Sequence, residues 1–175
     1  MWTSNDLRVA KYFATTSKCG REFDSQVSEA GLNTAVKLPS DVVRQSLVKL
    51  KQHGHIDSEE RGDGHEYWAR AALFYEFDKR FVGSDPKDDA EQVYRLLEKQ
   101  STHQIEVSQI LSAFPGWNVR RLNPALQYLA ERDLIKGQGG MGSALLFSEI
   151  TARSERCATG PKLPCGCPAG LASRS

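Results

Sequence analysis

The sequence predicts a mainly helical α+β fold in which one unit, three helices followed by a β-hairpin, occurs twice. The first observation is the stretch 38–68, where Val43, Leu47 and Leu50 recur at helical spacing and Gly54 follows them. The second is that the same apolar pattern returns 79 residues later. The third is a strand and turn signal after each copy. Together these observations predict two small units in tandem.

The two copies match at a constant spacing. Ile56 follows the first helix and opens an expected strand. The matching positions of the second copy are Leu122, Leu126, Leu129, Asp133 and Ile135. Two unrelated amphipathic helices would give similar apolar triplets, but the hairpin signal after both copies favours a repeat.

The first unit is expected to span residues 1–69. Its helices are indicated by caps and apolar spacing, and its hairpin by a glycine-rich turn. In chain order we expect a helix over 4–15, a short helix capped by Asp24 that buries Val27, a helix opened by Pro39 and Ser40, a strand from Ile56, a turn at 62–64 and a strand over 66–68.

A linker helix and a boundary are expected over 70–87. Phe74, Phe77 and Phe81 form a stripe on one face of this helix, while 83–87 is short, polar and broken by glycine and proline. The stripe has two interpretations. It packs on one of the two units, or it is an exposed interface for a homodimer or another protein.

The second unit is expected over 88–153 and a disordered tail over 154–175. The expected elements are a helix capped by Asp88 or Asp89, a short strand at Ile105, a helix over 107–111, a helix within 118–132, a strand from Ile135, a glycine-rich loop over 137–142 and a strand over 144–147.

Pro124 leaves two alternatives for the helix within 118–132. A proline inside a helix removes a hydrogen bond and clashes with the preceding turn, so the helix either begins at Asn123 or runs from Asn118 with a kink. A start at Asn123 would leave Arg120 and Arg121 in the preceding turn.

The order of three helices and a hairpin resembles a winged-helix domain, a variant of the helix-turn-helix, and its repetition resembles tandem winged-helix proteins. The resemblance covers roughly residues 4–150 and implies a DNA-binding protein, with a transcriptional regulator as the expected role. The third helix of such a domain enters the major groove, and the wing touches the backbone.

The resemblance and the residue chemistry together indicate duplex DNA as the partner. Arginine and glutamine read base edges, and lysine contacts phosphate. The candidate DNA-binding residues are Arg44, Gln45, Lys49, Gln52, Arg120, Arg121, Gln127 and Lys136. The second copy is the preferred face, because the first hairpin carries Asp57, Glu59, Glu60, Asp63 and Glu66 against one basic residue, Arg61.

A non-catalytic protein scaffold is the alternative function. Tandem winged helices also build assembly subunits, such as the small subunits of ESCRT-II and the kleisin-associated partners of condensin. Balanced charge, an acidic first hairpin and the aromatic stripe favour this alternative.

Composition excludes several other classes. With 23 basic and 22 acidic residues, no unit is an obvious polyanion binder by net charge alone. No apolar run reaches bilayer length, so we expect a soluble protein of the cytoplasm or nucleoid without membrane contact. No catalytic arrangement is present, and no enzyme activity or cofactor is expected. The expected hairpin brings His53, His55 and His65 near enough to meet at one metal, but histidines beside a helix end usually contact solvent or backbone carbonyls, so no metal site is expected there. Cys157, Cys165 and Cys167 lack the spacing of a structural zinc site.

Overall fold

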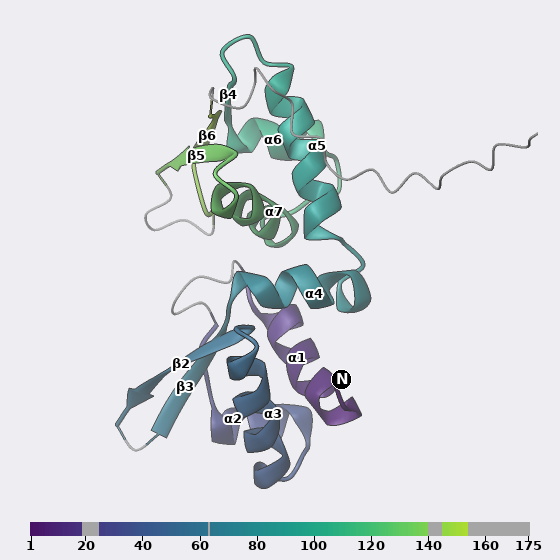
Figure 1. Cartoon of the computed structure of the whole chain (residues 1–175), viewed down its shortest axis with the longest axis vertical. Coiled ribbons are helices and arrows are strands. Elements are labelled where there is room, and N and C mark those ends of the chain that lie inside the picture. Colours follow the sequence, from purple (N-terminus) through teal and green to yellow (C-terminus); the bar gives the residue numbers. More distant parts are fainter. Residues whose placement is uncertain (19–24, 63, 140–144, 154–175) are drawn as a thin grey trace, which may run out of the picture.

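The chain folds into two lobes that stack along its long axis, with one helix lying between them (Figure 1). The computed structural model describes residues 1–18, 25–62, 64–139 and 145–153. Over these residues the fold is α+β and mainly helical, with seven helices and two small antiparallel sheets of three strands each. Each of these described helices is too short or too polar to cross a lipid bilayer.

Both lobes follow the order helix, strand, helix, helix, strand, strand. The first contains α1 (Ser4–Thr16), β1 (Val27–Ser28), α2 (Glu29–Val36), α3 (Ser40–Gln52), β2 (Ile56–Arg61) and β3 (Gly64–Ala69). The second contains α5 (Pro86–Glu98), β4 (Gln104–Glu106), α6 (Val107–Ala113), α7 (Val119–Glu131), β5 (Ile135–Gln138) and β6 (Glu149–Ala152). The sheet orders are β1-β3-β2 and β4-β6-β5, so the last strand is central in each lobe.

The residues that match at a spacing of 79 have the same structural roles. The apolar residues of α3 and α7 face their own cores, and all six are at most 2 % exposed: Val43, Leu47, Leu50, Leu122, Leu126 and Leu129. Gly54 and Asp133 follow these helices with φ of 73° and 60°. Ile56 and Ile135 then open β2 and β5 as buried residues. The repeat in the sequence is therefore also a repeat of the backbone.

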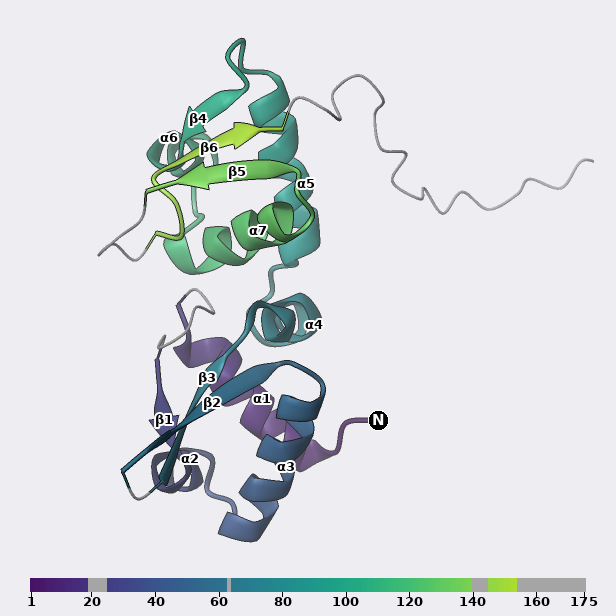
Figure 2. The same cartoon turned by 60° about the vertical axis from the view of Figure 1, so that its left-hand side comes forward.

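Each lobe has its own hydrophobic core. Phe13 of α1 and Leu47 of α3 are central to the first, whereas Val93 of α5 and Leu126 of α7 are central to the second. Figure 2 shows each sheet packed beside its own helices. Since burial of such side chains contributes about 1.5–3 kcal/mol each, each core is a separate source of stability.

Helix α4 (Ala71–Phe81) lies between the lobes and belongs to the first core. Phe74 is fully buried, Phe77 is 3 % exposed and Phe81 packs against the same cluster. The expectation of an exposed partner stripe is therefore corrected. The stripe packs on one of the two units, because an amphipathic helix this aromatic gains more from burial than from exposure.

Three expected elements differ from the structure. Val27 lies in β1 rather than in a helix, and the Ser28 hydroxyl caps α2 by accepting from the Gly31 amide. Helix α5 begins at Pro86, because the Asp85 carboxylate caps it by accepting from the Lys87 amide at 3.0 Å. The last strand is β6 over 149–152, rather than 144–147, and pairs with both β4 and β5.

Helix α7 runs without interruption from Val119 to Glu131 with Pro124 inside it. The Asn118 side chain caps it by accepting from the Arg121 amide at 2.9 Å. The alternative of a short helix beginning at Asn123 is thereby excluded. The expected tail, residues 140–142 of the glycine-rich loop and all four cysteines, by contrast, lie outside the described residues.

Candidate nucleic-acid interface

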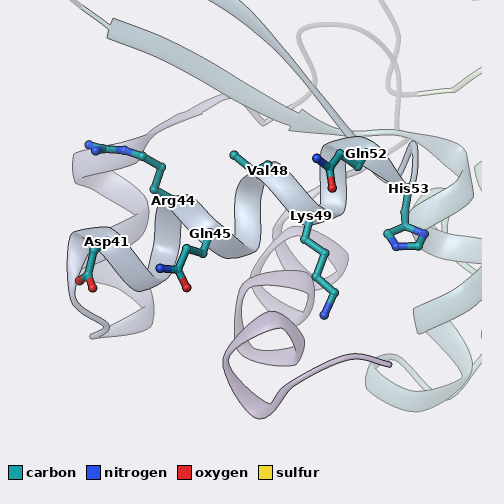
Figure 3. Close-up of a pocket in the computed structure, with 7 residues that line it drawn as sticks. All are labelled: Asp41, Arg44, Gln45, Val48, Lys49, Gln52 and His53. Carbon is teal, nitrogen blue, oxygen red and sulfur yellow. The ribbon is translucent and has the colours of Figure 1, made fainter.

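Helix α3 presents a row of polar side chains to solvent. Its apolar residues occupy one face, so helical geometry places Arg44, Gln45, Val48 and Gln52 on the outer side. Figure 3 shows these side chains along the helix. The Arg44 side chain is 66 % exposed and Val48 is 52 % exposed, although valine is a residue that proteins usually bury.

An open depression of about 680 Å³ follows this face of α3. Its lining comes entirely from that helix and the residue after it: Asp41, Arg44, Gln45, Val48, Lys49, Gln52 and His53. A surface of this shape fits an extended ligand laid against the helix better than a small molecule, because small-molecule sites enclose most of their ligand.

Arg44 is held by Glu29 of α2. Its Nη2 atom lies 2.9 Å from Oε1 of Glu29, and its Nε atom lies 3.3 Å from Oε2. The Glu29 hydrogen bond raises the pKa of Arg44. Such an exposed pair contributes little to stability, so a phosphate or a base edge can replace Glu29 at small cost.

Lys49 is on the same face but is tied to its own lobe. Its Nζ atom donates to the Asp6 carboxylate at 2.6 Å and to the Met1 carbonyl at 2.7 Å, and it lies 5.1 Å from the centre of the Trp2 ring. The Asp6 side chain is 7 % exposed and also accepts from the Ser46 hydroxyl. Lys49 therefore joins α3 to α1 and is a structural cation.

Asp6 has an unusual acidity for a buried carboxyl. Burial by itself raises its pKa, but hydrogen bonds from Lys49, from the Thr3 amide and hydroxyl and from Ser46 outweigh burial and lower it to about 2. The carboxylate therefore stays charged at every pH at which the protein is expected to work.

The hairpin of β2 and β3 is acidic in the structure as in the sequence. Glu59 and Glu60 are exposed on β2. Arg61, the basic residue beside them, forms ion pairs with Glu59 at 3.0 Å and with Glu66 at 3.6 Å. The described part of the hairpin is therefore unsuited to contact with a phosphate backbone.

Helix α7 offers a different set of side chains, because its arginines are engaged. Arg120 donates to both carboxylate oxygens of Asp78 in α4, at 2.8 and 2.7 Å, and to the Ala14 carbonyl at 2.7 Å. Its guanidinium lies 4.2 Å from the centre of the Phe74 ring. The side chains of Arg120 and Asp78 are 18 % and 1 % exposed. Burial raises the pKa of Asp78, and Arg120 opposes that rise.

Arg121 forms a comparable pair inside the second lobe. It donates to Asp89 of α5 at 2.8 and 2.7 Å and lies 4.5 Å from the centre of the Trp117 ring. The Asp89 hydrogen bonds raise the pKa of Arg121. Asp78 and Asp89 carried no sequence signal for these roles, since isolated acidic residues on helices are common and their partners are distant in sequence.

The structure thus separates the predicted contact residues into groups. Arg44, Gln45 and Gln52 lie together on α3. Gln127 of α7 is half-buried, and its Oε1 atom is enclosed without a hydrogen-bond donor. Lys136 is exposed on β5 in the other lobe. Val48, absent from the predicted contacts, joins the α3 group.

The histidines fall into two places. His53 and His55 pack around Trp2, with ring centres 4.8 and 5.4 Å from that ring, whereas His65 lies on β3 beside Tyr67. His55 is buried, which lowers its pKa, and its Nε2 atom is 3.1 Å from Glu76. Within the described residues, no group of three or more His, Cys, Asp or Glu side chains is placed to hold a metal ion.

No protein-family model matches the chain, and no curated protein matches it significantly. The function of the chain is therefore inferred from its side chains and their surroundings.

Proposed function

We propose that the chain is a tandem winged-helix protein that binds double-stranded DNA through α3, and that it acts as a transcriptional regulator. The observation that carries the proposal is the exposed row of Arg44, Gln45, Val48 and Gln52 on one helix face. The shared order of helices and strands in the two lobes, with the hairpin after the third helix, supports the winged-helix assignment.

The chemistry of the row suits base recognition in a major groove. Arginine donates in a bidentate manner to guanine, glutamine pairs with the adenine edge, and an apolar side chain contacts the thymine methyl group. Arg44, Gln45 and Val48 supply one of each kind within about one and a half helical turns. An exposed valine also gains an apolar contact in such a groove, and this contact removes its side chain from water.

The charges limit the number of phosphate contacts. The formal net charge is +1, the described hairpin is acidic, and Lys49 and Arg120 are paired within the chain. We therefore expect binding with a shallow salt dependence, because each phosphate contact contributes roughly 0.9 to the slope of log affinity against log salt.

The test is fluorescence anisotropy of the full chain, across a salt series, with a labelled duplex that the wild-type chain has selected from a random-sequence pool. Replacing Arg44 and Gln45 together by alanine is expected to weaken binding by about 1–3 kcal/mol. The matched control is Arg95→Ala. Arg95 is an equally exposed arginine, with a side chain 69 % exposed, and it pairs with Glu91 on α5 in the other lobe. Equal effects of the two variants, or no binding of the wild-type chain at low salt, would refute the proposal.

A protein scaffold remains the second candidate, and the acidic hairpin favours it. Glu59, Glu60 and Glu66 repel DNA but complement a basic protein surface. In that case the Glu59→Lys and Glu60→Lys double variant would gain affinity for duplex DNA and lose its protein partner. Wild-type chain that fails to bind duplex at low salt would support this candidate.

A further inference from the structure

Among the described residues, a polar stripe of α7 faces α1 and α4. In the first turn of α7, Arg120 donates hydrogen bonds to the Asp78 carboxylate of α4 and to the Ala14 carbonyl of α1. Glu131, at the other end of the helix, accepts from the Tyr75 hydroxyl of α4 at 3.0 Å. These residues lie on the side of α7 away from its buried leucines, where a winged-helix protein would present its groove-reading residues.

Two further contacts complete the stripe. The Asn123 side chain donates to the Lys18 carbonyl at 3.4 Å. The rings of Tyr128 and Tyr75 meet edge to face at 5.2 Å. Every one of these contacts is polar or aromatic, so the junction has the character of an interface between separable units rather than that of a core.

The ion pair between Arg120 and Asp78 is the charged contact of this junction, and it is largely buried. The Asp78 side chain is 1 % exposed, and the Nε atom of Arg120 is buried without an acceptor. Two charges that are withdrawn from water in this way lose hydration free energy, and they regain it when the two helices separate. This cost largely offsets the attraction between Arg120 and Asp78. The junction is therefore held by groups that are well solvated when it opens.

We propose that the pair of Arg120 and Asp78 is an autoinhibitory latch, which closes the second lobe onto α4 and so masks the outer stripe of α7 from DNA. When the latch opens, Arg120 is free to contact a phosphate of the duplex, and the chain gains a second recognition helix. The masking of α7 from DNA rests on the DNA-binding function proposed above, whereas the closed and open arrangements of the two lobes do not rest on it.

The chain provides a matched control for this latch. Arg121 and Asp89 form the same kind of pair, with side chains 35 % and 2 % exposed, but both belong to the second lobe. Removal of the Asp89 charge breaks a buried ion pair within one lobe and leaves the hydrogen bonds between Arg120 and Asp78 in place. Because Asp89 raises the pKa of Asp78, its loss favours the charged form of the latch carboxylate and does not open the latch.

Small-angle X-ray scattering of the full chain tests the latch without a ligand. Asp78→Arg is expected to increase the maximum dimension, and Asp78→Asn is expected to do so to a smaller extent. A double variant with Asp78→Arg and Arg120→Asp restores the pair with reversed charges and is expected to restore the wild-type curve. Asp89→Asn should leave the curve unchanged. Circular dichroism confirms that each variant is folded.

Duplex binding by the same proteins tests the masking. Asp78→Arg should bind about fivefold or more tightly than wild type, with a steeper salt slope, and the charge-reversed double variant should return to wild-type affinity. A scattering curve for Asp78→Arg identical to that of wild type would overturn the latch. If that variant opens but does not bind more tightly, the masking is overturned. If neither the wild-type chain nor any variant binds duplex DNA, the DNA-binding function is refuted. The scattering curves test the latch independently of that result.

Discussion

Helices α3 and α7 hold the same position in their lobes, yet their outer faces have different surroundings. Both bury three apolar residues at the same spacing, and both end before a residue with positive φ, Gly54 or Asp133. The outer side of α3 is open, whereas the outer side of α7 packs on α1 and α4 through Arg120 and Tyr128. The inner residues thus specify the fold, and the outer residues with their neighbours decide what the helix is able to bind.

The largest expected effect concerns α4, a difference between the two lobes, because this helix has no counterpart among the described residues of the second lobe. Phe74→Ala leaves a cavity in the first core and should cost about 3–5 kcal/mol of unfolding free energy, because Phe74 is fully buried. Phe81→Ala, at the half-buried end of the stripe, should cost less. Denaturant unfolding measures both, and a Phe74→Ala loss no larger than that of a surface substitution would show that α4 does not complete the first core.

A smaller effect distinguishes the two hairpins. A Cβ on Gly137 of β5 would lie 2.2 Å from the Phe147 ring, whereas a Cβ on Gly64 of β3 would have no neighbour within 4 Å. Gly137→Ala should therefore cost about 1–3 kcal/mol through displacement of the ring, and Gly64→Ala should be close to neutral. Thermal melting of the two variants checks this, and similar melting temperatures would contradict the close packing of Phe147.

The smallest effect concerns the way in which each lobe joins its first and third helices. Asp6 binds Lys49 in the first lobe, as Asp89 binds Arg121 in the second. The pKa of Asp6 is lowered from 3.8 to about 2, so the carboxylate stabilises the fold above about pH 4. This contribution, about 2 kcal/mol at most, is lost as the pH falls from about 4 to about 2.

Denaturant unfolding at pH 7, 4 and 2 measures the contribution of Asp6. Asp6→Asn should lower the stability at pH 7 and flatten its dependence on pH in this range. An unchanged pH profile in Asp6→Asn would show that another acid is responsible for the acid-induced loss of stability.

The comparison also shows where sequence reasoning succeeds. The apolar triplets, Gly54 and the two hairpins carry local periodicity and turn chemistry, so the helices, the α+β class and the repeat were predictable. The last strand was placed too early, because Phe147 is apolar but packs over Gly137 instead of pairing in the sheet.

The surroundings of the charged residues were not predictable, for a different reason. Arg44 and Arg120 look alike in sequence, each on the third helix of its unit. Only the tertiary structure reveals that Arg120 is buried against Asp78, 42 residues earlier, while Arg44 pairs with Glu29 and stays 66 % exposed. An ion pair between distant helices leaves no periodic trace, so the sequence favours the second copy as the DNA face although its two arginines are engaged within the chain.

Helix α4 finally determines where the chain can be divided. The expected end of the first unit suggests a cut near Ala69, but such a cut would remove Phe74 and Phe77 from the lobe that they complete. A fragment that ends after Gly83 keeps them. We expect a protease to release a stable N-terminal piece only when it cleaves in the short segment between α4 and α5, so limited digestion would map the unit that folds by itself.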